Sequence, residues 1–315
     1  MFAARCLGVS LAVFIVLYVS LSVAVGRGWK LVCRILKPGS ARGLADLLFI
    51  LRILPFALSC AVTLVFTLPS FLLLEPHGTD EAIGTAPMVL GILCLALLGI
   101  GVVQAYRAQL KTSRAMTEWL NGATVMESSP EATVLQTRKR APSLTVAGVC
   151  APKVLVSEEA VAALTEPELQ TALRHEMTHV RRYDNLKKLL FRFSVFPGMK
   201  NLESAWSEEA EMAADDAAVS SIQDALDLAA ALIKVSRLGP IQSSAELATG
   251  LLHSSTALSA RIQRLFAWEK TQTPESGGLN WRYGLPSAAI ATVAVIVSYS
   301  SALTQMHALT EWLVR

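Results

Sequence analysis

The stretch that decides the fold of this chain is His175-Glu176-Met177-Thr178-His179. Residues four apart on a helix point the same way, one turn above the other, so the two imidazoles can hold one metal ion. The Glu beside the first His can then reach a water bound to that metal. This H-E-x-x-H spacing is typical of zinc hydrolases, in which the metal acidifies the water and the carboxylate takes its proton. With only five His in the chain, the pattern is fairly specific.

Apolar residues gather in four long runs. At 53% hydrophobic and 17% charged residues, the 315-residue chain is more apolar than an ordinary soluble protein. Each run is free of Asp, Glu, Lys and Arg and is about long enough to cross a hydrocarbon core of roughly 30 Å as a helix. We therefore expect a mainly α-helical membrane protein with four transmembrane helices, at about 6–26, 53–74, 85–106 and 285–304.

The first run, 6–26, has an alternative interpretation as a cleaved signal peptide, because Ala24-Val25-Gly26 resembles a cleavage site. Two observations count against it. The run is longer than the apolar region of a usual signal peptide, and its basic residues lie mostly after the run instead of before it. We favour a retained membrane helix.

The charges between the runs predict their orientation. Five basic residues and one Asp lie at 27–47, three acidic and no basic residues lie at 75–81, and basic residues follow again from 107. The positive-inside rule then places both termini outside and the segments 27–47 and 107–284 in the cytoplasm. Nucleic-acid binding is not expected, because the net charge is only +3 and the basic residues flank the apolar runs.

The segment 107–284 is long enough for one cytoplasmic domain. Short β-branched runs separated by Pro predict a small antiparallel sheet, and a capping-box pattern at Thr165-Glu166-Pro167-Glu168 opens the helix that carries both His. The expected strands are 132–137, 143–149 and 153–156, and the expected helices are 165–190, 202–221 and 224–238. Residues 285–315 would form the last span and a short outer tail.

A catalytic zinc needs three protein ligands and one open position. The five Cys form no C-x-x-C pair, so thiolate ligands are not indicated. The first acidic helix after the His pair supplies several candidates for the third ligand, and its Ala-rich flanks favour a buried face. These candidates are Glu208, Glu209, Glu211, Asp215 and Asp216, of which Glu208, Glu211 and Asp215 share one helical face.

The chain resembles the BlaR/MecR-type membrane metallopeptidases, the antirepressor family of the beta-lactam sensor-transducers. The most specific segments are HEMTHVRRYDN at 175–185 and EMAADDAAV at 211–219. The resemblance implies an α+β, gluzincin-like domain in a bacterial inner membrane, with His175, His179 and Glu211 as Zn²⁺ ligands and Glu176 as catalytic base. It also implies that Asp215 orients a ligand His.

Two features depart from that family. The family usually has a Cys directly before the Asp that corresponds to Asp215, but this chain has Ala214 there, which argues that this position is not a ligand. Only about ten residues follow the last predicted span, so we expect no extracellular penicillin-binding sensor, and beta-lactam sensing is not implied. The related HtpX and CaaX-type metallopeptidases fit less well, because HtpX-like proteins have apolar spans between the two motifs and this chain has none there.

These patterns predict an integral membrane zinc endopeptidase that cleaves a cytoplasmic repressor or a membrane protein, with a homodimer or a separate sensor as a further partner. The small sheet would bind the substrate as an added strand. His253 or Tyr183 could stabilise the oxyanion, although a lone His or Tyr is more often structural. The alternatives are a non-enzymatic membrane scaffold with a structural or decayed zinc site, and a quality-control protease of the HtpX/CaaX type.

Overall fold

Long helices dominate the first third of the protein. The computed structural model describes residues 2–74, 84–128, 130–138, 142–238, 247–250, 255–268 and 299–310. Within these residues, three helical segments are long and apolar enough to cross a membrane, at Phe2–Leu36, Ala41–Leu74 and Thr85–Leu120. They are α1 (Phe2–Leu36), α2 (Ala41–Val62) continued by the π-helix η1 (Thr63–Thr67) and α3 (Leu68–Leu74), and α4 (Thr85–Leu120). A helix suits such apolar sequence because it satisfies its own backbone hydrogen bonds.

The helices extend beyond the predicted apolar runs. α1 continues to Leu36 and α2 begins at Ala41, so most of the loop expected at 27–47 is helical and only residues 37–40 connect the two helices. α4 likewise continues past residue 106 to Leu120. The added turns carry polar and charged residues, which a helix tolerates once it has left the apolar environment. The predicted span 285–304 lies outside the described residues except for 299–304, which are helical.

A five-stranded sheet follows α4, in the order β1-β2-β4-β3-β5. Its strands are β1 (Thr124–Ser128), β2 (Thr133–Thr137), β3 (Leu144–Ala147), β4 (Lys153–Ser157) and β5 (Ala248–Gly250). The prediction of an antiparallel sheet was wrong, because β2 and β4 pair in parallel. The cause is that β4 turns back from β3 as a hairpin and inserts between β2 and β3, so β2 and β4 both run opposite to β3. β1 and β5 were not predicted.

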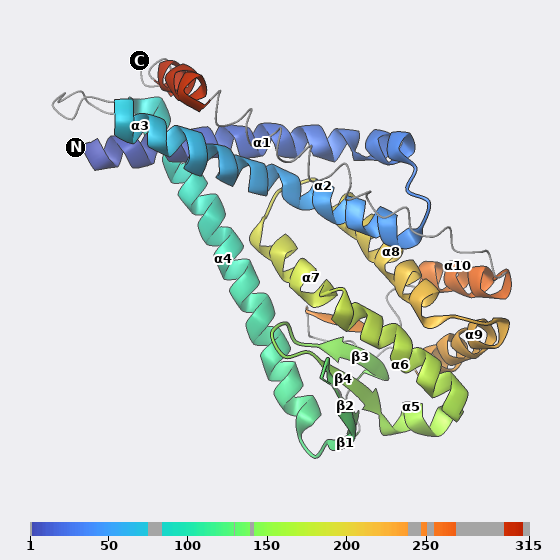
Figure 1. The fold of residues 1–315 in the computed structure, drawn as a ribbon. Helices are drawn as coiled ribbons and strands as arrows, with labels where there is room; N and C mark the ends of the chain where they lie inside the picture. Colours follow the sequence, from blue (N-terminus) through green and yellow to red (C-terminus); the bar gives the residue numbers. More distant parts are fainter. Residues whose placement is uncertain are drawn as a thin grey trace.

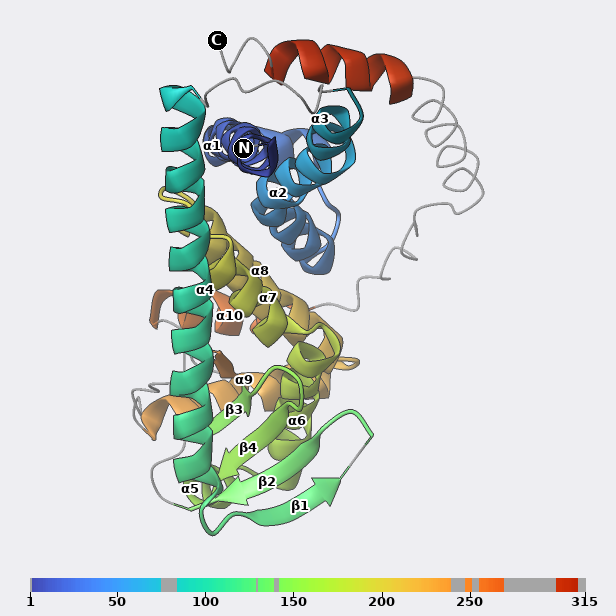
Figure 2. The same ribbon diagram turned by 90° about the vertical axis from the view of Figure 1, so that its left-hand side faces the viewer.

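Helices pack on both faces of the central strands of the sheet, whereas β1 at its edge is exposed (Figure 2). Side chains alternate across a strand, so neighbouring residues of β4 enter different cores. Leu155 packs with Ala115 and Trp119 at the end of α4, whereas Val154 and Val156 pack with the helices on the opposite face. The C-terminal end of α4 therefore packs directly against one face of the sheet.

Six helices complete the described part of the domain (Figure 1): α5 (Glu158–Ala163), α6 (Glu166–Arg181), α7 (Asp184–Phe193), α8 (Lys200–Ala218), α9 (Ile222–Arg237) and α10 (Ser255–Phe266). The capping box between Thr165 and Glu168 is present at the start of α6. The single helix expected over 165–190 was wrong, because the chain breaks at Tyr183, whose φ is 54°. This left-handed residue separates the two helices. Asp184 therefore begins α7 instead of continuing α6.

Candidate metal centre

Two imidazoles of α6 lie one turn apart in the protein interior. His175 and His179 are both buried, and their Nε2 atoms are 3.2 Å apart. The apolar residues of α6, among them Leu169 and Ala172, pack with β3, β4 and α9. This packing fixes the helix and holds the His pair within the domain, as the spacing of the pair had predicted.

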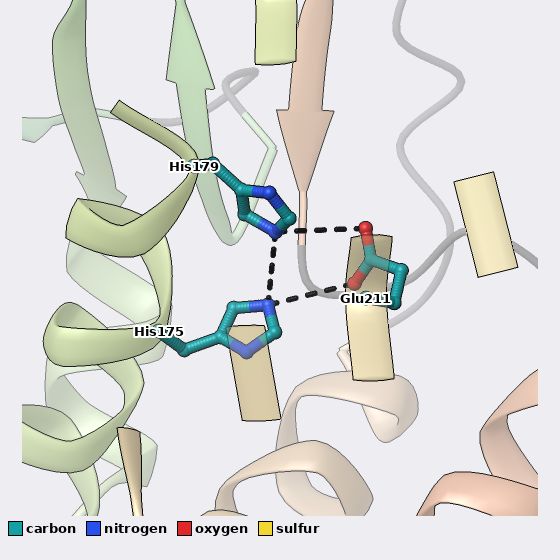
Figure 3. A group of neighbouring side chains, drawn as sticks. All are labelled: His175, His179 and Glu211. Carbon is teal, nitrogen blue, oxygen red and sulfur yellow. Dashed lines mark hydrogen bonds and ion pairs between the residues drawn. The ribbon is translucent and has the colours of Figure 1, made fainter. Parts of the chain in front are cut away.

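Glu211 of α8 completes the group (Figure 3). Its Oε2 lies 3.5 Å from Nε2 of His175, and its Oε1 lies 3.6 Å from Nε2 of His179. One ligand atom from each of the three residues lies within 4.8 Å of the others, a spacing that one metal ion can bridge. Among the other acids considered on this helix, Glu208 and Asp216 are exposed. The acid that lies with the His pair is thus the one that the family resemblance implies as a ligand, and its role as a ligand stays a prediction.

A carboxylate lies behind each imidazole. Nδ1 of His175 is 3.0 Å from Oδ1 of Asp215, and Nδ1 of His179 lies 2.7 Å from Oδ2 of Asp184. When Nδ1 carries the proton and faces a carboxylate, Nε2 presents its lone pair to the metal position. Asp215 lies where the resemblance had placed it. Asp184 was missed, although it belongs to the segment 175–185 that carries the resemblance.

A buried guanidinium links the two acids of α8. Arg261 of α10 is 3% exposed and donates from Nε and Nη2 to Asp215, at 2.8 and 2.6 Å, and from Nη1 to Glu211 at 3.0 Å. Burial alone would raise the pKa of both carboxyls. The imidazoles and Arg261 outweigh burial and lower both pKa values, so both acids are ionised. Sequence reasoning missed Arg261, which lies 46 residues from its main partner.

Glu176 lies beside the ligands but has a different environment. Its side chain is fully buried, and neither carboxylate oxygen has a hydrogen-bond partner among the described residues. Burial raises the pKa of this carboxyl to about 7, although His175 and His179 lower it. Buried polar atoms without partners are rare in folded proteins. Here the two free oxygens indicate a place for a group that the polypeptide itself does not supply.

The electrostatics of the ligand group fit a bound cation. Burial would lower the pKa of His175, but Asp215 and Glu211 raise it to about 9, so the site favours positive charge at the imidazoles. A divalent metal ion meets the same demand and replaces the proton on binding. Two imidazoles and one carboxylate are also a known donor set of catalytic zinc sites. The residues present therefore fit a metal ion.

Neither of the two residues considered for oxyanion stabilisation, Tyr183 and His253, is seen in the buried ligand group. Tyr183 is 67% exposed and occupies the break between α6 and α7, so it does not belong to the buried group. His253 lies outside the described residues. Both assignments stay predictions. The short strand β5 runs beside the ligands in Figure 3 and pairs with β3.

Long apolar helices joined to a domain with a buried His-His-Glu group are the features expected of a membrane metallopeptidase. Comparison with known families identifies it further: residues 82–265 match the family described as BlaR1 peptidase M56. The match covers more than half of the chain and runs from the start of α4 to α10, so the chain belongs to this family. A comparison with curated proteins found no match. The family resemblance inferred from the motifs is confirmed.

Proposed function

We propose that this protein is an integral membrane, zinc-dependent endopeptidase of the gluzincin type, with His175, His179 and Glu211 as zinc ligands and Glu176 as the catalytic base. The observation that carries the proposal is the Glu176 carboxylate, which is buried next to three converging ligand atoms and lacks a partner for either oxygen. A structural metal site has no need of such a group, because four protein ligands usually close it.

Zinc, when bound, would act as a Lewis acid that polarises the scissile carbonyl and acidifies the attacking water. Glu176 takes the proton from the attacking water and later donates it to the leaving amine. The raised pKa of Glu176 suits a group that must both accept and release a proton near neutral pH. Asp184 and Asp215 keep the ligand imidazoles in the required tautomer and orientation.

A substrate segment in extended conformation would bind along the sheet. β3 is paired with β4 on one side and with β5 on the other, so its backbone is not open to a further strand. The sheet edge that accompanies the ligands in Figure 3 is β5. We therefore propose that the substrate pairs at this end of the sheet and not at β1, the opposite edge.

The class of substrate follows from the position of the domain. We propose that residues 1–106 anchor the protein, that residues 107–284 form the peptidase domain on the cytoplasmic side of a bacterial inner membrane, and that residues 285–315 return the C-terminus to the outside. The basic residues at 27–47 and after 106 support this orientation. The substrate would then be a cytoplasmic or membrane-associated regulatory protein, such as a repressor, and its cleavage would transmit a signal.

The substitution Glu176→Gln tests the mechanism. We expect the purified full-length variant to bind zinc as the wild type does and to lose about 10²–10⁴-fold in the cleavage of fluorescently quenched casein, because the amide cannot accept the proton. Glu208→Gln is the matched control, since Glu208 is an exposed acid of α8, and should keep full activity. Full activity of Glu176→Gln would refute the mechanism.

A further inference from the structure

The turn between α7 and α8, residues 194–199, is held by the first two membrane helices. The last carbonyls of a helix have no partner within the helix and need donors from elsewhere. Here the spans supply them: Tyr18 of α1 donates its hydroxyl to the carbonyls of Ser194 and Val195, both at 3.0 Å. Arg52 of α2 donates to the carbonyls of Phe191 and Ser194, at 3.2 and 2.7 Å.

Arg52 also binds the helix that follows the turn. Its Nε donates to Oε1 of Glu203 at 2.7 Å, and its Nη1 donates to Oγ of Ser194 at 3.1 Å. The side chain is 2% exposed, and residues 47–62 of α2 hold no other charged side chain. A buried charge in such a place is costly unless it is fully paired, so a change that separates α2 from α8 is strongly disfavoured.

The third span reaches the end of α7 through a glycine. A Cβ placed on Gly101 of α4 would clash with the carbonyl oxygen of Phe193, a backbone atom that cannot rotate away as a flexible side chain could. A Cβ placed on Gly99, two residues earlier in the same helix, would meet nothing within 4 Å. The ring of Phe193 also packs against the ring of Phe56 of α2. All three spans therefore contact one short stretch of the peptidase domain (Figure 1).

The two helices joined at this turn carry the parts of the metal centre that α6 lacks. α7 begins with Asp184, which holds His179, and α8 carries Glu211 and Asp215. α6, with the His pair, packs on the sheet and on α9 in addition to its contacts with α7 and α8. The contacts of the turn with the spans therefore determine the positions of α7 and α8, and with them the positions of their acids relative to the imidazoles of α6. Glu203 and Glu211 are eight residues apart on one helix, about 12 Å along its axis.

We infer that Tyr18, Arg52 and Gly101 are positioning residues of the metal centre: the membrane spans hold the α7–α8 turn, and through it they place the metal ligand Glu211 and the His179 partner Asp184. The inference rests on the proposed assignment of the ligands. It makes the spans part of the peptidase machinery and gives them a role beyond anchoring. Loss of a group hydrogen-bonded to a metal ligand, as Asp184 is to His179, typically changes metal affinity or activity by about 10–100-fold.

The pair Gly101→Ala and Gly99→Ala tests this inference in the full-length protein in detergent. We expect Gly101→Ala to weaken zinc binding by about tenfold or more, measured by competition with a chromophoric chelator, and to lower kcat for casein with little change in KM. Gly99→Ala should match the wild type in both. Equal zinc affinity and kcat in the two variants, with only a lower unfolding temperature for Gly101→Ala, would show a merely structural contact and overturn the inference.

Tyr18→Phe and Arg52→Gln provide a second measurement, which decides the inference even if Gly101→Ala does not fold, and Arg52→Lys is the rescue variant. Tyr18→Phe removes only the hydroxyl and should weaken zinc binding, whereas Arg52→Gln should weaken it more strongly and Arg52→Lys should restore part of the loss by keeping the charge opposite Glu203. Unchanged zinc affinity in both Tyr18→Phe and Arg52→Gln would overturn the inference. A wild type that binds zinc but never cleaves casein would refute the proposed function alone, since the affinity measurements still decide the positioning role.

Discussion

Arg261→Met should destabilise the metal-free protein far more than the zinc-bound protein. Arg261 makes three hydrogen bonds of 2.6–3.0 Å to Asp215 and Glu211 and is 3% exposed. Methionine fills much of the same volume but leaves two buried carboxylates without their cation. Removing one partner of a buried ion pair typically costs about 3–5 kcal/mol. At roughly 2–4 °C per kcal/mol for a domain of this size, the unfolding temperature without metal should fall by about 6–20 °C.

Zinc should recover part of this loss, because the bound ion supplies positive charge next to Glu211. The assay is thermal unfolding of the full-length protein in detergent, with chelator and with excess Zn²⁺. Arg264→Met is the matched control, since Arg264 lies on the same helix and pairs with Asp216, but both side chains are about 40% exposed. An exposed pair contributes about 0–1 kcal/mol. If Arg261→Met lowers the unfolding temperature no more than Arg264→Met, the guanidinium is not required by the buried acids.

Two further outcomes follow from the contacts around α6. Asp184→Asn should weaken zinc binding by about 10–100-fold, because the amide does not stabilise His179 as the carboxylate does; Asp216→Asn, an exposed change, should leave the affinity unaltered, and a similar loss in both would contradict the role of Asp184. Burial would raise the pKa of Glu168, but Lys234 outweighs it and lowers the pKa below the ordinary 4.5, so its stabilisation is present above that pH and is lost as the pH falls through the lowered pKa. Glu168→Gln should therefore cost about 0.5–1 kcal/mol at pH 7 and less at low pH, measured by chemical denaturation, and an equal cost at both pH values would disprove the ionic contribution.

Local signals were sufficient to predict the parts of the site that lie on single elements. The spacing of His175 and His179, with Glu176 between them, requires only that the segment be helical, and the capping box at Thr165 supports that directly. The acids of α8 could be narrowed to one face by helical spacing, but the choice of Glu211 needed the family resemblance. Geometry within one helix is accessible from sequence because 3.6 residues per turn determine it.

Contacts between distant elements were not accessible in this way. Nothing in the local pattern distinguishes Arg261 from the more exposed Arg264 three residues later. Only the position of α10, which packs on α9 and brings Arg261 to the buried acids of α8, separates them. The break at Tyr183 was missed because Tyr is seldom left-handed and no Gly or Pro marks the position. The parallel pairing of β2 with β4 depends on which side of β3 the chain returns, which the strand patterns do not encode.

If α4 crosses the membrane as proposed, the length of this continuous helix limits the distance between the sheet and the membrane. Its 36 residues measure about 54 Å, and a hydrocarbon core takes up about 30 Å of that length. At most about 24 Å is left to carry the sheet, whose β4 rests on Trp119 at the far end of the helix. An extended chain covers that distance in about seven residues. A membrane-bound substrate of the proposed peptidase would therefore need only a short juxtamembrane tether to reach the sheet.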